Sequence, residues 1–164
     1  MNPLQLDIDA GLELLPSNMR TAQAKVLLYA TSRQENPKRL PKQVGGPAVG
    51  DYQMESGGGV RGVLEFDSPT IRTAVTAVCR ARGVAASRLS VYEALQHDPV
   101  LAAAFARLLY YTDPGRLPVT GDEQGAWDLY LRTWRPGAFK RQPEELRAKW
   151  SKSYRDAMVA YGLA

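Results

Sequence analysis

Apolar residues recur at helical spacing along most of this chain. Near the N-terminus an apolar side chain stands at every third or fourth position, as Leu4, Ile8, Leu12 and Leu15. This spacing places the apolar side chains on one face of a helix. Similar patterns predict helices over residues 3–15, 21–34, 68–82, 87–95, 100–111, 122–134 and 143–161. The chain is therefore expected to be mostly α-helical.

Two of these segments are preceded by pairs of residues that commonly start helices. Ser68-Pro69 and Asp98-Pro99 each combine an N-cap side chain with a proline in the first turn. The segment 100–111, which follows the second pair, has the sequence VLAAAFARLLYY and is apolar on nearly every side. A helix without a polar face is typically buried, so we expect this one at the centre of the molecule.

The segment 36–62 interrupts the helical pattern because it is rich in glycine and proline. Both residues disfavour helices, so the segment is predicted to be irregular, with at most a short β-hairpin over residues 50–55. Long irregular loops of compact domains commonly carry binding and catalytic residues. The sequence shows no internal repeat and no domain linker, which predicts one domain over residues 1–164.

Composition narrows the chemistry that this chain can perform. The chain has a single cysteine, Cys79, and a single histidine, His97. An intrachain disulfide is therefore excluded, and the set of Cys and His ligands that a zinc site needs is lacking. We expect no metal and no cofactor. A catalytic triad would have to use His97, and no nucleophile motif accompanies it, so we expect a structural role there.

The net charge of +4 is modest, and basic residues gather in two clusters, within residues 38–42 and 132–141. Such clusters suit an anionic polymer, either nucleic acid or a cell-wall glycan with its peptides. No motif of interleaved basic and aromatic residues supports nucleic-acid binding. A basic helical nucleic-acid-binding module is therefore the weakest of the candidate functions, and nucleic acid is not expected as a partner.

The sequence has no feature of membrane insertion or export. No apolar run approaches the roughly 20 residues that span a bilayer. Residues 1–15 contain Asp7, Asp9 and Glu13 and no basic stretch. We therefore expect no membrane association and no signal peptide, and synthesis in the cytoplasm.

One carboxylate is a candidate for acid–base chemistry. Glu35 ends an apolar helical segment and directly precedes the Gly/Pro-rich loop. An acid buried there against Tyr29 or Tyr52 would have its pKa raised by loss of solvation, as a general acid requires. The alternative is an exposed glutamate at a helix end. The C-terminus of a helix disfavours negative charge, which slightly favours a functional role.

Two stretches around this glutamate carry a resemblance to a known family. The first is VLLYATSRQE at 26–35, and the second is GPAVGDYQME at 46–55. They resemble the core of the lysozyme-like superfamily, especially its lytic transglycosylases. In that family a helix ends in a catalytic glutamate, and a later Gly-x-x-Gln motif lines the glycan cleft. Glu35 matches the glutamate, and Gly50 and Gln53 match the motif.

Further segments make the resemblance more specific. GGGV at 57–60 and AWDLYLRTWRPG at 126–137 look like parts of small lysozyme-like proteins of tailed bacteriophages and prophages. The resemblance implies a lysozyme-like helical domain whose Gly/Pro-rich loop or hairpin lines a cleft. It also implies a peptidoglycan-cleaving enzyme, associated with the virion and its proteins and acting in the periplasm. Glu35 would be the acid/base. The sugar-binding residues would be Gln53 and Tyr130, followed by Tyr52, Gly50, Trp134 and Arg135.

The number of carboxylates determines which reaction this site can perform. A hydrolytic glycosidase commonly uses two carboxyl groups. A lytic transglycosylase, by the resemblance, uses one glutamate that protonates the glycosidic oxygen and then accepts the proton of the sugar's 6-hydroxyl. Asp51 and Glu55 are the nearby candidates for a second carboxylate, and each is also compatible with a structural role in a turn. Both reactions therefore remain open at this point.

A second hypothesis is a virion or assembly protein that keeps the lysozyme-like fold without activity. It rests on two departures from the family pattern. Asn36 follows Glu35 where serine is usual, and Asp51-Tyr52 replaces the usual apolar pair in the Gly-x-x-Gln motif.

Overall fold

The structure is a computed structural model that describes residues 1–164, and it confirms the mostly helical class. It contains eight α-helices, α1 Pro3–Glu13, α2 Ala22–Glu35, α3 Arg61–Leu64, α4 Pro69–Arg82, α5 Arg88–Ala94, α6 Pro99–Tyr111, α7 Glu123–Trp134 and α8 Pro143–Ala160. Shorter helical turns cover Ser17–Met19, Ser56–Val60 and Gly137–Lys140. None of the helices combines the length and the apolar character that crossing a membrane would require.

The helices begin where the sequence supplies capping side chains. Ser68 accepts a hydrogen bond from the backbone of Ile71, and Asp98 accepts one from that of Leu101. Both interactions satisfy amide groups that the first turn of a helix leaves without partners. The predicted starts of α4 and α6 are therefore confirmed to within a residue.

Helix α6 occupies the centre of the molecule. It packs against α1, α2, α3, α4 and α7, and ten consecutive residues, Leu101 through Tyr110, are buried. This confirms the expectation from its apolar sequence. A close approach by α1 depends on Gly11, where a Cβ atom would lie 2.7 Å from the Val100 carbonyl oxygen and 2.8 Å from the Ala103 Cβ.

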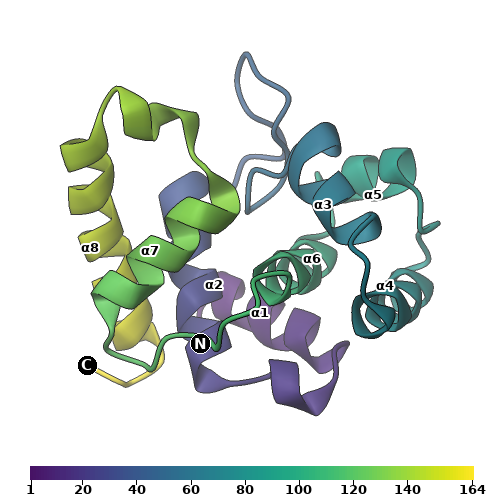
Figure 1. Cartoon of the computed structure of the whole chain (residues 1–164), viewed down its shortest axis with the longest axis horizontal. Helices are drawn as coiled ribbons and strands as arrows, with labels where there is room; N and C mark the ends of the chain where they lie inside the picture. The colour runs from purple at the N-terminus through teal and green to yellow at the C-terminus, as the bar shows by residue number, and fades with distance from the viewer.

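Two groups of helices flank this central helix. Figure 1 shows α7 and α8 on one side and α3, α4 and α5 on the other, with α1 and α2 near α6. Helix α8 packs closely on α2, and α7 packs on both α8 and α6. The end of α2 is therefore held by the α7–α8 group.

The prediction of an irregular segment over residues 36–62 is wrong at its C-terminal end. The turn Ser56–Val60 is kinked at Gly58, whose φ of −106° and ψ of −107° are not helical, but helix α3 begins at Arg61 and includes Gly62. Val60 and Val63 are buried, and a Cβ atom on Gly59 would lie 3.0 Å from the Met54 Cε. Tertiary packing therefore outweighs the low helix propensity of glycine here.

The first part of the same segment is a loop, and it contains no hairpin strands. Its backbone pairing consists of isolated bridges between Lys42 and Val49 and between Val49 and Met54. Asn36 holds the loop at both ends, because its side-chain amide donates to the carbonyls of Leu40 at 2.8 Å and Gly50 at 3.0 Å. The residue that departs from the family's usual serine thus has a structural role.

Candidate active site

Glu35 is the last residue of α2, and it is held by a side chain from α7. The Tyr130 hydroxyl donates a hydrogen bond to the Glu35 carboxylate. The Tyr130 ring stacks on the Trp150 ring of α8, with centroids 4.7 Å apart. Packing of α7 and α8 on each other thus fixes where the tyrosine hydroxyl lies.

Burial raises the pKa of Glu35 from 4.5 to about 7. Two interactions oppose this rise, the hydrogen bond from Tyr130 and the positive charge of Lys149. Lys149 lies close by because its ammonium group donates to the Gln34 carbonyl at the end of α2. The Glu35 residue as a whole is partly exposed, but its carboxyl group is buried, and loss of solvation is the main cause of the raised pKa.

The resemblance leads us to expect Tyr130 near Glu35, and the structure confirms this contact, whereas neither Tyr29 nor Tyr52 is the hydrogen-bond partner of the carboxylate. The Tyr29 hydroxyl accepts a hydrogen bond from Asn2, and its ring packs edge-on against Tyr161, 6.1 Å between centroids. The Tyr52 side chain is fully buried, and its hydroxyl has no hydrogen-bond partner. Tyr130 contacts the carboxylate in place of either of these residues.

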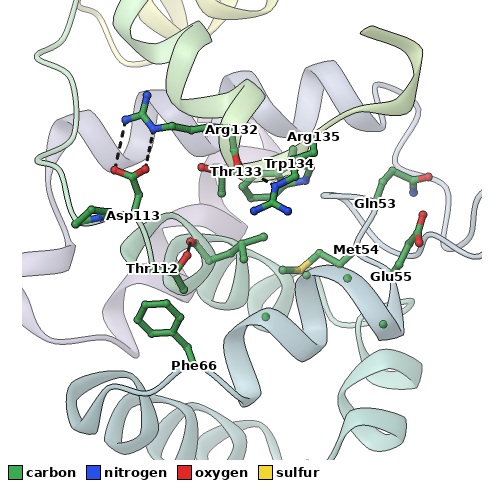
Figure 2. Close-up of a pocket in the computed structure, with 16 residues that line it drawn as sticks. Gln53, Met54, Glu55, Phe66, Thr112, Asp113, Arg132, Thr133, Trp134 and Arg135 are labelled. Atoms are coloured by element: carbon green, nitrogen blue, oxygen red, sulfur yellow. Dashed lines mark hydrogen bonds and ion pairs between the residues drawn. The ribbon is translucent and has the colours of Figure 1, made fainter. Parts of the chain in front are cut away.

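A cleft of about 660 Å³ lies next to this region (Figure 2). One wall comes from the segment 53–62, and the other comes from the last turn of α7 and the residue after it. Figure 2 shows Arg132, Thr133, Trp134 and Arg135 along this second wall, and Gln53, Met54 and Glu55 opposite Arg135. The Gly/Pro-rich segment and the end of α7 therefore face each other across a cavity.

Glu35 and Tyr130 are not among the residues that line this cleft. Trp134 connects the two regions. It lines the cleft, its ring stacks on that of Tyr130 at 6.4 Å between centroids, and its indole nitrogen donates to the Tyr52 carbonyl at 2.8 Å. Glu35 is therefore linked to the lining of the cleft through Tyr130 and Trp134.

The residues of the Gly-x-x-Gln motif form a tight turn that contributes to two different cavities. Gly50 has a φ of +72°, and Gln53 has a φ of +49°. The Gln53 side-chain amide donates to the Gly50 carbonyl at 2.9 Å. Gln53 lines the cleft, whereas Gly50 lines a separate, smaller cavity of about 280 Å³ that also contains His97.

The two candidates for a second carboxylate lie in different places. Asp51 is buried and accepts hydrogen bonds from Arg39 at 2.9 and 2.6 Å, and Arg39 also pairs with Asp7. Asp51 lines the smaller cavity. Glu55 is exposed and lines the cleft. Neither carboxylate interacts with Glu35, whose polar neighbours are Tyr130 and Lys149.

Three polar residues near the site were not predicted from the sequence. Lys149 stands 115 residues from Gln34, whose carbonyl it contacts. Asp113 and Arg132 form an ion pair at 2.7 Å on the lining of the cleft. Only the position of Arg132 within a basic cluster offered a signal in the sequence. No three His, Cys, Asp or Glu side chains lie together in an arrangement that could hold a metal ion.

The chain was compared with protein-family models, with curated proteins and with solved structures, and none of them matches it.

Proposed function

We propose that this protein is a peptidoglycan-cleaving glycosidase with a lysozyme-like fold, in which Glu35 is the general acid and base. The observation that carries the proposal is the Glu35 carboxyl group, which is buried and hydrogen-bonded to Tyr130 and has a pKa of about 7. Near neutral pH such a group is present in both protonation states. It can therefore donate a proton to a leaving oxygen and later accept one.

The position of Tyr130 supports this role. Its hydroxyl donates to the carboxylate, so it fixes the orientation of the side chain that would transfer the proton. Orientation of a reacting group accounts for a large part of enzymatic rate enhancement. Trp134, whose ring stacks on that of Tyr130, adds an aromatic surface to the cleft, and aromatic rings are suited to packing against the apolar faces of sugars.

The arrangement of carboxylates favours the transglycosylase reaction over hydrolysis. Asp51 forms an ion pair with Arg39, and Asp113 forms one with Arg132. Glu55 is exposed on the other wall of the cleft. A single carboxyl group suffices to protonate the glycosidic oxygen and then accept the proton of the sugar's own 6-hydroxyl, which gives a 1,6-anhydro product.

The biological context that the sequence resemblance implies is part of the proposal. The substrate is the glycan strand of peptidoglycan. The protein is encoded by a bacteriophage or prophage, associates with other virion proteins and acts in the periplasm. The two groups of helices around α6, with a cleft between α7 and the segment 53–62, support the lysozyme-like fold.

Product analysis on purified peptidoglycan tests the proposal. Wild-type protein should release muropeptides with 1,6-anhydro ends, and Glu35→Gln should lower the rate by about 10²–10⁴-fold because it removes the transferable proton. Glu145→Gln is a matched control, since Glu145 is exposed in the first turn of α8. It should leave the rate unchanged. Products with reducing ends would instead indicate a hydrolytic muramidase.

Two further variants separate the one-carboxylate and two-carboxylate mechanisms. Asp51→Asn and Glu55→Gln should each cost far less activity than Glu35→Gln, once circular dichroism shows that the variants are folded. A loss as large as that of Glu35→Gln in either variant would favour hydrolysis with that residue as the second carboxylate.

One observation favours the second hypothesis, a virion or assembly protein without activity. Glu35, the proposed acid and base, does not line the cleft, whereas Trp134 does. If wild-type protein releases no product from several wall preparations across a range of pH values, this hypothesis becomes the better account.

A further inference from the structure

Two arginines, Arg132 and Arg135, line the cleft, and only Arg132 is paired with a carboxylate. Arg132 is neutralised by Asp113, with separations of 2.7 and 3.4 Å between their nitrogen and oxygen atoms. Arg135 takes part in no ion pair, and its Nε donates only to the Arg132 carbonyl at 3.3 Å. Figure 2 shows the Arg135 guanidinium turned towards the cavity, with Glu55 further out at the rim.

The position of Arg135 follows from the way α7 ends. Arg135 is the C-cap residue and has φ 49° and ψ 55°, a left-handed conformation that glycine usually takes at this place. Pro136 follows and prevents the helix from continuing. The left-handed conformation turns the chain at the end of α7. Together with the hydrogen bond to the Arg132 carbonyl, it holds the Arg135 guanidinium group beside the end of the helix, at the cleft.

The wall of the cleft opposite Arg135 is formed by the segment 53–62, and part of it has no side chains. It contains three consecutive glycines, Gly57, Gly58 and Gly59. A Cβ atom on Gly57 would meet no atom within 4 Å, and one on Gly58 would meet only the Glu55 Cβ at 3.5 Å. This part of the cleft wall therefore carries no side chains and has open space beside it.

We propose that Arg135 binds a carboxylate of the peptide stem attached to the glycan, so that the protein prefers strands whose stems carry free carboxylates. This inference rests on the proposed function for its substrate class. The sugar rings of peptidoglycan offer hydroxyl and amide groups, and its stem peptides offer carboxylates. A guanidinium group matches a carboxylate with two parallel hydrogen bonds. Arg132 is not free for this contact because Asp113 holds it.

Binding to two wall preparations tests the inference. Intact sacculi carry free carboxylates on their stem peptides, whereas sacculi treated with carbodiimide and methylamine carry the same strands with these carboxylates converted to methylamides. Co-sedimentation should use Glu35→Gln as the background, because this variant leaves the strands uncut. Adding Arg135→Gln should weaken binding to intact sacculi about tenfold or more, since a hydrogen bond to a charged group is lost. Binding to methylamidated sacculi should change far less.

Two additional variants complete the design. Arg135→Lys keeps the charge without the paired donors, so it should restore only part of the binding to intact sacculi. Arg80→Gln removes an exposed arginine from α4, outside the cleft, and should change neither measurement. If Arg135→Gln loses binding equally to both preparations, or loses binding to neither, the inference is wrong.

The binding assay also separates this inference from the proposed function. If wild-type protein cleaves no strand but the Arg135 variants still lose binding to intact sacculi alone, the proposed activity is wrong and the recognition of stems stands. If wild-type protein cleaves both preparations at equal rates and Arg135→Gln changes neither rate, the activity stands and the recognition of stems is wrong.

Discussion

The raised pKa of Glu35 predicts a dependence of folding stability on pH that is separate from any activity. The group binds its proton more tightly in the folded protein, with a pKa of about 7, than at its ordinary value of 4.5. Its contribution to stability is therefore complete below about pH 4.5 and is lost as the pH rises through about 7. Glu35→Gln removes this titration while keeping the shape of the side chain.

The size of the effect follows from the same two values. A rise in pKa from 4.5 to about 7 corresponds, at about 1.4 kcal/mol per pKa unit, to at most about 3 kcal/mol. Relative to wild type, Glu35→Gln should gain this amount between about pH 4.5 and about pH 8. For a domain of this size, the Tm of Glu35→Gln should rise by about 6–12 °C relative to that of wild type over this pH range.

Thermal unfolding followed by circular dichroism at pH 4.5, 6, 7 and 8 measures this difference. Any loss of stability from the substitution that does not depend on pH lowers the Tm equally at every pH. The change with pH in the Tm difference between Glu35→Gln and wild type therefore reports the titration of Glu35 alone. Glu145→Gln, on an exposed residue, should show no such trend. A Tm difference between Glu35→Gln and wild type that stays constant from pH 4.5 to pH 8 would refute a raised pKa at Glu35.

Two other predictions concern the hydrogen bond to Glu35 and the turn before Gln53. Tyr130→Phe removes a donor that lowers the pKa of Glu35, so the alkaline limb of the profile of kcat/KM against pH should move up by about one unit. A downward move would contradict this role. Gly50→Ala should lower the free energy of unfolding by about 2–4 kcal/mol in denaturant titration. Its φ is +72°, and the new Cβ would lie 2.4 Å from the Leu95 carbonyl oxygen. Gly57→Ala, where a Cβ meets no atom within 4 Å, is the matched control and should cost far less.

The helices and their order along the chain follow from local sequence. Capping residues such as Ser68 and Asp98 act on backbone groups within the next turn, so their effect can be predicted from neighbouring residues alone. The burial of α6 was equally predictable, because a helix with no polar face gains stability only inside the molecule. The position of Glu35 at a helix end also followed from local pattern.

The surroundings of Glu35, in contrast, depend on tertiary packing. Tyr130 and Lys149 lie far from it in the chain, and they reach it because α7 and α8 pack against each other and α8 packs on α2. Helical spacing shows which face of a helix is apolar, but it does not show which other helix covers that face. Local pattern therefore offers only Tyr29 and Tyr52 as aromatic neighbours of Glu35, whereas the contact with Tyr130 on α7 is expected from the family resemblance alone.

The same distinction holds for the Gly/Pro-rich segment and for the acidic residues. Local propensity predicts an irregular chain through residue 62, but helix α3 begins at Arg61, where burial of Val60 and Val63 stabilises it. Asp51 looked equally suited to a turn or to the site, and the approach of Arg39 directs it to an ion pair at the smaller cavity. Propensity acts between neighbours in the chain, whereas packing and charge pairing act between residues that only the folded chain brings together.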